Sequence, residues 1–161
     1  MSEKIRPARK SDVKIILQFV KELAAFERLS HQVNLTEMKV KKSFLDKNSV
    51  AKTLIIEKNG VPCGFAVYFY NFSTFLGSKG IYLEDLYIRS EFRRQGLGRK
   101  VFAYLANLAV KEKCQRFEWS VLDWNKPAIK FYRELGARPL KQWQIQRLDA
   151  KAIRKLFKKS I

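Results

Sequence analysis

Residues 90–100 read SEFRRQGLGRK and combine cations with two glycines in a way that suits an anionic ligand. Gly96 and Gly98 permit positive φ angles and a close approach of the backbone. The stretch follows a strand-like segment, GIYLEDLYI, and precedes an apolar pattern typical of a helix. Because the first N–H groups and the dipole of a helix attract phosphate, the stretch is a candidate phosphate-binding loop. A solvated basic turn is the alternative interpretation.

Two familiar nucleotide-binding motifs do not fit this loop. The dinucleotide fingerprint requires a third glycine at the position of Val101. The P-loop requires Gly-Lys-Ser/Thr, but an arginine follows Gly98. The pattern that remains is Arg93-x-x-Gly96-x-Gly98, which is short and needs support from other parts of the chain.

A second set of residues, Asn125, Ala128 and Tyr132, has the three- and four-residue spacing that places side chains on one helix face. The phenol of Tyr132 can donate a proton at neutral pH, because the reference pKa of tyrosine is about 10. The alternative is a tyrosine that only packs against the core from an amphipathic helix.

Two acidic residues, Glu84 and Asp85, interrupt an apolar strand in a chain with 33 Lys and Arg but only 15 Asp and Glu. Neighbouring side chains of a strand point to opposite faces, so we expect the two carboxylates to have different roles. Both are candidates for a functional role, and a structural ion pair with an arginine is the alternative.

The formal net charge of +18 favours a polyanionic partner, such as nucleic acid, anionic lipid or a phosphorylated small molecule. No apolar run reaches the roughly 18 residues of a membrane helix, and the N-terminus lacks the apolar core of a signal peptide. These patterns predict a cytoplasmic protein without a membrane partner. Cys63 and Cys114 are not in a paired motif, so we expect reduced thiols, and with the lone His31 they do not form a zinc site.

The elements that must position these residues follow from apolar periodicity and turn signals. A hairpin with Asn59-Gly60 at its turn is the clearest of them. Helix caps are expected at Ser11 or Asp12, Thr36, Asn125 and Asp149. Strands are predicted at residues 4–8, on both sides of the turn in 53–72, and at 80–88, 116–122 and 143–148, and helices at 11–29, 36–45, 99–113, 125–137 and 149–159. This order predicts an α/β (α+β) domain with one mixed sheet flanked by helices, spanning residues 1–161 as a single domain.

The phosphate-loop pattern and the Asn125–Tyr132 pattern together resemble the GNAT acetyltransferases. Four segments, VKELAAFERLSHQV, IYLEDLYI, VLDWNKPA and FYRELGA, resemble the diamine acetyltransferase branch of that family. This branch holds the spermidine/spermine acetyltransferases and the thialysine N-epsilon-acetyltransferases, and FERLS and VLDWN are more similar to the latter. The resemblance covers residues 5–148, with a departure at Arg94, where relatives usually have glycine.

The resemblance implies a GNAT-like mixed, mostly antiparallel sheet, a homodimer, and acetyl-CoA as the acetyl donor without a metal. It implies that the loop binds pyrophosphate mainly through backbone N–H groups and that one strand binds the pantetheine arm. Tyr132 would be the general acid that protonates the leaving thiolate. The implied cofactor-binding residues are Leu86, Tyr87, Ile88, Arg93, Arg94, Gln95, Gly96, Leu97, Gly98, Arg99, Asn125, Lys126, Pro127, Ala128 and Tyr132.

The acceptor implied by the resemblance is the primary amine of a small molecule. Glu84 would contact this amine and relay its proton, and Phe26, Glu27, Asp85 and Trp143 would complete the substrate site. The positive field of the protein counts against spermine, and less against a zwitterion such as thialysine or lysine, and the local carboxylates Glu27 and Glu84 can oppose this field.

Two alternatives are kept: an acetyltransferase of protein N-termini or lysines, and a basic nucleic-acid-binding module. The second is disfavoured because most aromatic residues fall on expected core positions rather than in an exposed stacking array.

Overall fold

The computed structural model describes residues 2–159. Contacts between residues divide the chain into two compact units, Met1–Ser120 and Val121–Ile161, which are described separately. The expected single domain over residues 1–161 stays a prediction. In the described part of the chain, no helix is long and apolar enough to cross a membrane.

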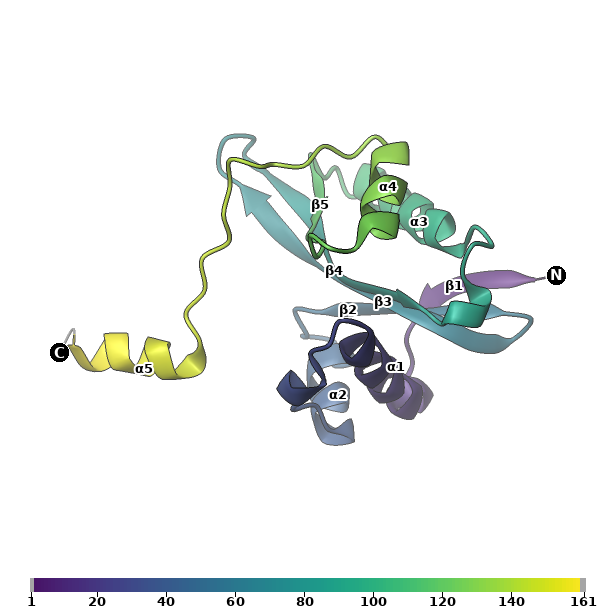
Figure 1. The fold of residues 1–161 in the computed structure, drawn as a ribbon, viewed down its shortest axis with the longest axis horizontal. Coiled ribbons are helices and arrows are strands. Elements are labelled where there is room, and N and C mark those ends of the chain that lie inside the picture. Colours follow the sequence, from purple (N-terminus) through teal and green to yellow (C-terminus); the bar gives the residue numbers. More distant parts are fainter. Residues whose placement is uncertain (1, 160–161) are drawn as a thin grey trace. The chain divides into compact units, whose positions relative to one another are not determined.

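The first unit is built on one five-stranded sheet in the order β1-β2-β3-β4-β5 (Figure 1). All neighbouring strands are antiparallel except β4 and β5, which are parallel. The mixed, mostly antiparallel sheet is therefore confirmed. Asn59 and Gly60 form the β2–β3 turn with φ angles of 50° and 78°, which suits a tight hairpin. The strands are β1 (Glu3–Pro7), β2 (Lys52–Lys58), β3 (Val61–Ser73), β4 (Ser78–Ile88) and β5 (Phe117–Trp119).

Helices cover both faces of the sheet in this unit. Figure 1 shows α1 (Val13–Phe26) and α2 (Glu37–Phe44) on one face and α3 (Leu97–Lys111) on the other. Because both faces are covered, consecutive residues of β2 are buried, as at Leu54, Ile55 and Ile56. Short 3₁₀ turns connect the elements at η1 (Lys10–Asp12), η2 (Ser30–Gln32) and η3 (Ser90–Phe92).

Two apolar layers fill the space between sheet and helices. On the α1 side, the rings of Phe19 and Phe65 stack with their centroids 5.8 Å apart. In the other layer, the ring of Phe102 on α3 lies 5.4 Å from that of Phe117 and 4.8 Å from that of Trp119, both on β5. These contacts hold α1 and α3 on the sheet, and both helices carry residues of the candidate site at their ends.

The two cysteines are free thiols, as expected. Cys63 is fully buried, and its Sγ–H donates to the carbonyl oxygen of Ile56 at 3.4 Å. Cys114 is partly exposed.

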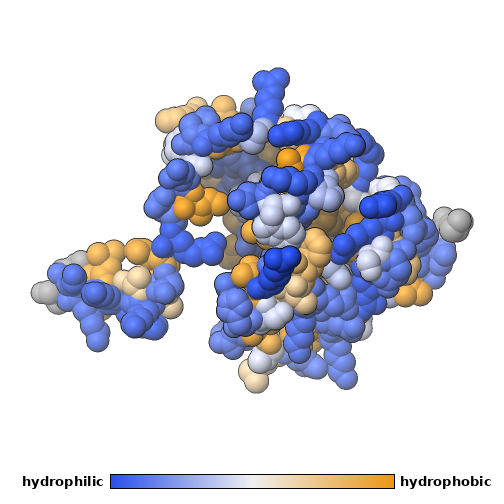
Figure 2. All heavy atoms as spheres, viewed as in Figure 1, coloured by the Kyte–Doolittle hydropathy of each residue, from blue (hydrophilic) through white to orange (hydrophobic). Residues whose placement is uncertain are grey.

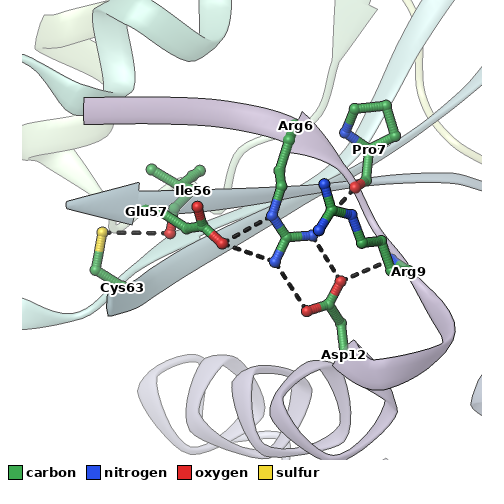
Figure 3. Close-up of polar contacts among 7 residues, drawn as sticks. All are labelled: Arg6, Pro7, Arg9, Asp12, Ile56, Glu57 and Cys63. Carbon is green, nitrogen blue, oxygen red and sulfur yellow. Dashed lines mark hydrogen bonds and ion pairs between the residues drawn. The ribbon is translucent and has the colours of Figure 1, made fainter. Parts of the chain in front are cut away.

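Arg6 joins β1 to two other elements through its guanidinium (Figure 3). Its Nη1 and Nη2 donate to the Asp12 carboxylate at 2.7 and 2.9 Å, and its Nε donates to Glu57 Oε1 at 2.7 Å. Hydrogen bonds from Arg6 hold the pKa of Asp12 below its usual range. Asp12 occupies the N-cap position of α1, as one of the two expected residues, but its carboxylate accepts hydrogen bonds from Arg6 and from Arg9 N and forms no cap hydrogen bond to α1.

The second unit contains two capped helices. Asn125 Oδ1 accepts a hydrogen bond from Ala128 N at 3.3 Å at the start of α4 (Lys126–Glu134), and Gly136 follows that helix with a φ of 87°. Asp149 Oδ1 accepts from Ala152 N at 2.7 Å at the start of α5 (Ala150–Lys159). Asn125, Asp149 and Thr36, whose hydroxyl caps α2, confirm three of the expected caps.

Two strand expectations need correction. Residues 143–148 form no strand, although they alternate between apolar and polar types. No other strand lies in the described part of the second unit, so this segment has no ladder to join, and Trp143, Ile145 and Leu148 are exposed. The strand expected at 116–122 is limited to Phe117–Trp119, which is the length over which it pairs with β4.

Candidate active site

The basic loop ends in the uncapped N-terminus of α3. Gly96 occupies the cap position with a φ of 80°, and no side chain caps the helix. The first hydrogen bond of the helix runs from Lys100 N to Gly96 O at 3.1 Å, so the N–H groups of residues 97–99 precede it and have no intrahelical acceptor. The space where a side chain would stand at Gly96 is open. This geometry fits an anionic group of a coenzyme.

Two of the cations of the loop, Arg93 and Lys100, bind partners within the protein. Arg93 Nε donates to Ile88 O at 2.7 Å, and its guanidinium lies over the ring of Phe26, 5.0 Å from the centroid. Lys100 pairs with Glu3 on β1. Arg94 and Arg99 form no ion pair within residues 2–159, so they are the loop cations available to a ligand.

Arg94, the departure from the family pattern, lies in the left-handed region with a φ of 59°. That conformation favours glycine, which agrees with the glycine that the family resemblance implies at this position. The side chain of Arg94 is exposed. The loop therefore keeps the backbone conformation expected of glycine while it carries an additional cation.

The β4 strand has a free edge beside this loop. Within residues 2–159, β5 pairs with β4 only at residues 81–83. The predicted pantetheine-binding residues Leu86, Tyr87 and Ile88 lie beyond this pairing. Their backbone groups on that edge can hydrogen-bond an extended ligand as an added strand would.

A β-bulge places both acidic residues of β4 at one groove. Asp85 pairs with Val67 and Leu83 pairs with Tyr68, so Glu84 is the extra residue. Glu84 and Asp85 both line the groove. The expectation of opposite faces assumed strict alternation, which the bulge interrupts at this point of β4.

This groove, which we call the carboxylate groove, has a volume of about 470 Å³. Glu27, just after α1, joins the two acidic residues of β4 in its wall. The lining consists of Val20, Leu23, Ala24, Glu27, Leu29, Gln32, Val33, Asn34, Leu35, Phe44, Glu84 and Asp85. It holds three carboxylates and no Lys, Arg or His, so it suits a cation.

Burial raises the pKa of two of these carboxyl groups. The pKa of Asp85 rises to about 6, mainly through burial and then through the neighbouring charges of Glu84 and Glu27. Burial also raises the pKa of Glu27. Glu84 is exposed and forms no ion pair within residues 2–159, so the structure gives no support to the alternative of a structural ion pair. A ligand ammonium in the groove would relieve the repulsion among the three carboxylates.

Three predicted residues are not part of the groove lining. Phe26 is 41% exposed and contacts the guanidinium of Arg93. Tyr132 on α4 is half-buried, and burial raises the pKa of its phenol, so it holds its proton at neutral pH. Trp143 is 72% exposed in the segment between α4 and α5. Tyr132 and Trp143 belong to the second unit, so their roles stay predictions.

Sequence reasoning missed other parts of the lining, including Leu29, Gln32 and Asn34. They lie between α1 and α2. Leu29 and Gln32 fall within the segment that resembles the diamine acetyltransferases, but neither their type nor their spacing marked them as lining residues. In the described part of the chain, no group of three or more His, Cys, Asp or Glu residues could hold a metal ion.

Comparisons with known proteins agree with this geometry. The model of the Acetyltransferase (GNAT) family matches residues 17–137. The chain is 35% identical to thialysine N-epsilon-acetyltransferase of Mus musculus, over 96% of this chain and 97% of that protein. It is 29% identical to an L-ornithine N5-acetyltransferase of Arabidopsis thaliana, over 100% of this chain and 90% of that protein.

Solved structures share the fold. An integron cassette protein from the mobile metagenome of V. cholerae superposes with a TM-score of 0.81 at 25% identity, covering 98% of this chain and 99% of that one. The enzyme AAC(6')-Iy, solved with a bisubstrate analogue that contains CoA, superposes with a TM-score of 0.75 at 16% identity, covering 93% and 100%. At that identity, the second match shows the fold alone.

Proposed function

Because the chain belongs to the GNAT acetyltransferase family, we propose that it transfers the acetyl group of acetyl-CoA to the side-chain amine of a lysine-type amino acid. Two of the relatives are named for their substrates, thialysine and ornithine, and we take these two molecules as model acceptors. The observation that carries the proposal is the carboxylate groove, which gathers Glu27, Glu84 and Asp85 beside the free edge of β4 in a protein of net charge +18.

The acceptor amine must lose a proton before it can attack. A lysine-type amine has a pKa of about 10.4 and is an ammonium at neutral pH. The carboxylates of the groove attract this ammonium, and Glu84 orients it and passes its proton to solvent through water. Asp85, with a pKa of about 6, is ionised at neutral pH and adds to the attraction.

Acetyl-CoA, when bound, supplies an activated acetyl thioester. The N–H groups of residues 97–99 and the guanidinium groups of Arg94 and Arg99 would hold its phosphates. The backbone of residues 86–88 would hold its extended arm, and an N–H group of this edge would stabilise the oxyanion.

Direct attack forms the bond between the amine nitrogen and the acetyl carbon and breaks the carbon–sulfur bond. In our proposal the phenol of Tyr132 donates its proton to the departing sulfur. The acylated nitrogen loses its second proton to solvent, and the Tyr132 phenolate regains a proton from solvent, so that one proton is released for each amine that enters as an ammonium. Burial raises the pKa of Tyr132, so the phenol is protonated at neutral pH and its proton is available when the thiolate departs. We also propose a homodimer, which light scattering of the purified protein can test.

A panel of acceptors tests the proposal. Thialysine, lysine, ornithine, spermine and a peptide with a free N-terminus are each incubated with acetyl-CoA, and thiol release is followed. We expect the highest kcat/KM for the lysine-type amino acids. A preference for the peptide would replace the proposal with a protein acetyltransferase, and thiol release that does not depend on the acceptor would contradict both.

A further inference from the structure

We propose that a second pocket, lined by Lys21 and Ser30, binds the α-carboxylate of the acceptor and makes the enzyme select amino acids over diamines. This inference rests on the proposed function and specifies which part of the substrate lies where. It assigns a role to two residues that have none in the chemistry described above.

The second pocket adjoins the carboxylate groove. It has a volume of about 460 Å³ and is lined by Lys21, Ser30, Val33 and Leu35. Val33 and Leu35 also line the carboxylate groove, so the two cavities share an apolar wall. A ligand that follows this wall passes from the acidic lining to Lys21.

The charge of Lys21 is available to a ligand. Lys21 is exposed and forms no ion pair within residues 2–159. Glu22, the acid next to it in the sequence, is bound by Arg89 through two hydrogen bonds of 3.0 and 2.9 Å. The ammonium of Lys21 and the hydroxyl of Ser30 are therefore donors without a charged partner, as a carboxylate site requires.

The two cavities carry opposite charges, Lys21 in one and three carboxylates in the other. Lys21 and Glu27 are six residues apart along α1 and its end, which gives a rise of about 9 Å and directions that differ by about 120° around the helix axis. The flexible side chain of Lys21 therefore has to reach the wall formed by Val33 and Leu35, which line both cavities. A terminal ammonium then lies among the carboxylates and an α-carboxylate lies at Lys21. A diamine would instead place its second cation near Lys21, where like charges repel.

Matched pairs of acceptors that differ only in the α-carboxylate test the inference: ornithine with putrescine, and lysine with cadaverine. Steady-state kinetics at saturating acetyl-CoA gives kcat and KM for each. The wild-type protein should prefer the amino acid in both pairs. In Lys21→Met, KM for the amino acids should rise about tenfold to a hundredfold, because a hydrogen-bonded charge contact is lost, with little change in kcat. KM for the diamines should stay the same or fall.

Three further variants make the result specific. Lys21→Arg should retain most of the preference, because it keeps the charge, and Ser30→Ala should weaken it by a smaller factor. Lys14→Met removes another exposed lysine of α1 and should leave the kinetic constants of both pairs of acceptors unchanged. Equal changes for both members of a pair in Lys21→Met, or no change, would overturn the inference. Failure of the wild-type protein to acetylate any of the four amines would instead refute the proposed function.

Discussion

At the scale of single residues, the carboxylate groove explains why acids stand in an apolar strand of a strongly basic protein. The sequence marked Glu27, Glu84 and Asp85 as site residues, and the structure brings the three into one lining. It could not mark the β-bulge that turns Glu84 and Asp85 to the same groove, because the bulge depends on the pairing of β4 with β3. The raised pKa of Asp85 follows mainly from its burial and then from the neighbouring charges of Glu84 and Glu27.

The pH dependence of amine binding should report this ionisation. Because the pKa of Asp85 is about 6, the groove loses one negative charge as the pH falls through 6, and its affinity for a cation falls with it. Calorimetric titration of ornithine into the free protein between pH 5 and 8 should show a Kd that rises at the acid end. Asp85→Asn should flatten this profile, whereas Glu37→Gln on α2 should not. A wild-type profile without any change near pH 6 would argue against an ionising Asp85.

Replacement of Asp85 should also stabilise the fold at high pH. Its folded-state pKa lies above the ordinary value of about 3.9, so the folded protein holds this proton more tightly than the unfolded chain. Stability is therefore lost as the pH rises from about 4 to 6. At pH 8, Asp85→Asn should raise the free energy of unfolding on the order of 2 kcal/mol, with little difference at pH 4. Urea titrations at both pH values measure this, and an Asn variant less stable than wild type at pH 8 would be the contrary result.

Tyr132 allows a clean test of general-acid catalysis. Tyr132→Phe keeps the ring and removes the proton donor, so kcat should fall on the order of a hundredfold while the Kd of CoA changes little. Tyr104→Phe on α3 provides a matched control and should retain its activity. Full activity of Tyr132→Phe would show that another group protonates the thiolate.

At the scale of elements, the connection from β4 to α3 forms the proposed coenzyme site. Its glycine spacing and position before a helix could be recognised in the sequence, and the uncapped start of α3 agrees with them. The engagement of Arg93 by Ile88 and of Lys100 by Glu3 could not be recognised, because the partner of Lys100 comes from a distant strand. In the segment 143–148, by contrast, the sequence predicted a strand that the structure does not contain. Its apolar and polar residues alternate, but no other strand lies within the described part of the second unit for it to pair with.

The loop should bind the coenzyme through its backbone more than through its charge. Gly96→Val forces a β-branched residue into a φ of 80°, which distorts the N–H groups that follow, whereas Lys100→Ala removes a cation that already pairs with Glu3. Calorimetry should therefore show a much larger increase in the Kd of CoA for Gly96→Val. Gly77→Val introduces a similar strain in the β3–β4 turn, where φ is 56°, and should leave CoA binding unchanged. A larger increase in the Kd of CoA for Lys100→Ala than for Gly96→Val would instead support the interpretation of residues 90–100 as a solvated basic turn.

At the scale of the whole molecule, the net positive charge of the protein attracts anionic ligands and repels cationic ones. Hydrophilic side chains cover most of the face shown in Figure 2, and the net charge is +18. This field attracts coenzyme A and repels a polycation, while the carboxylate groove acts locally in the opposite sense. Composition alone could predict the first effect, but the second required the fold to bring three acids together.

Salt should separate these two effects. At low ionic strength, kcat/KM should be higher for thialysine than for spermine, because the long-range field opposes only the polycation strongly. Raising the salt from about 0.02 to 0.3 M shortens the screening length, so the ratio of the two kcat/KM values should decrease. Parallel assays of both amines over this range measure the ratio. A preference for spermine at low salt would contradict the electrostatic account.

The central claim is acetyl transfer from acetyl-CoA to the terminal side-chain nitrogen of a lysine-type amino acid. The most direct measurement incubates the protein with acetyl-CoA and thialysine and identifies the product by mass spectrometry and NMR, while the released thiol is counted. The account predicts one acetyl group on the side-chain nitrogen for each thiol released. Thiol release without an acetylated amine, or acetylation at the α-nitrogen, would contradict it.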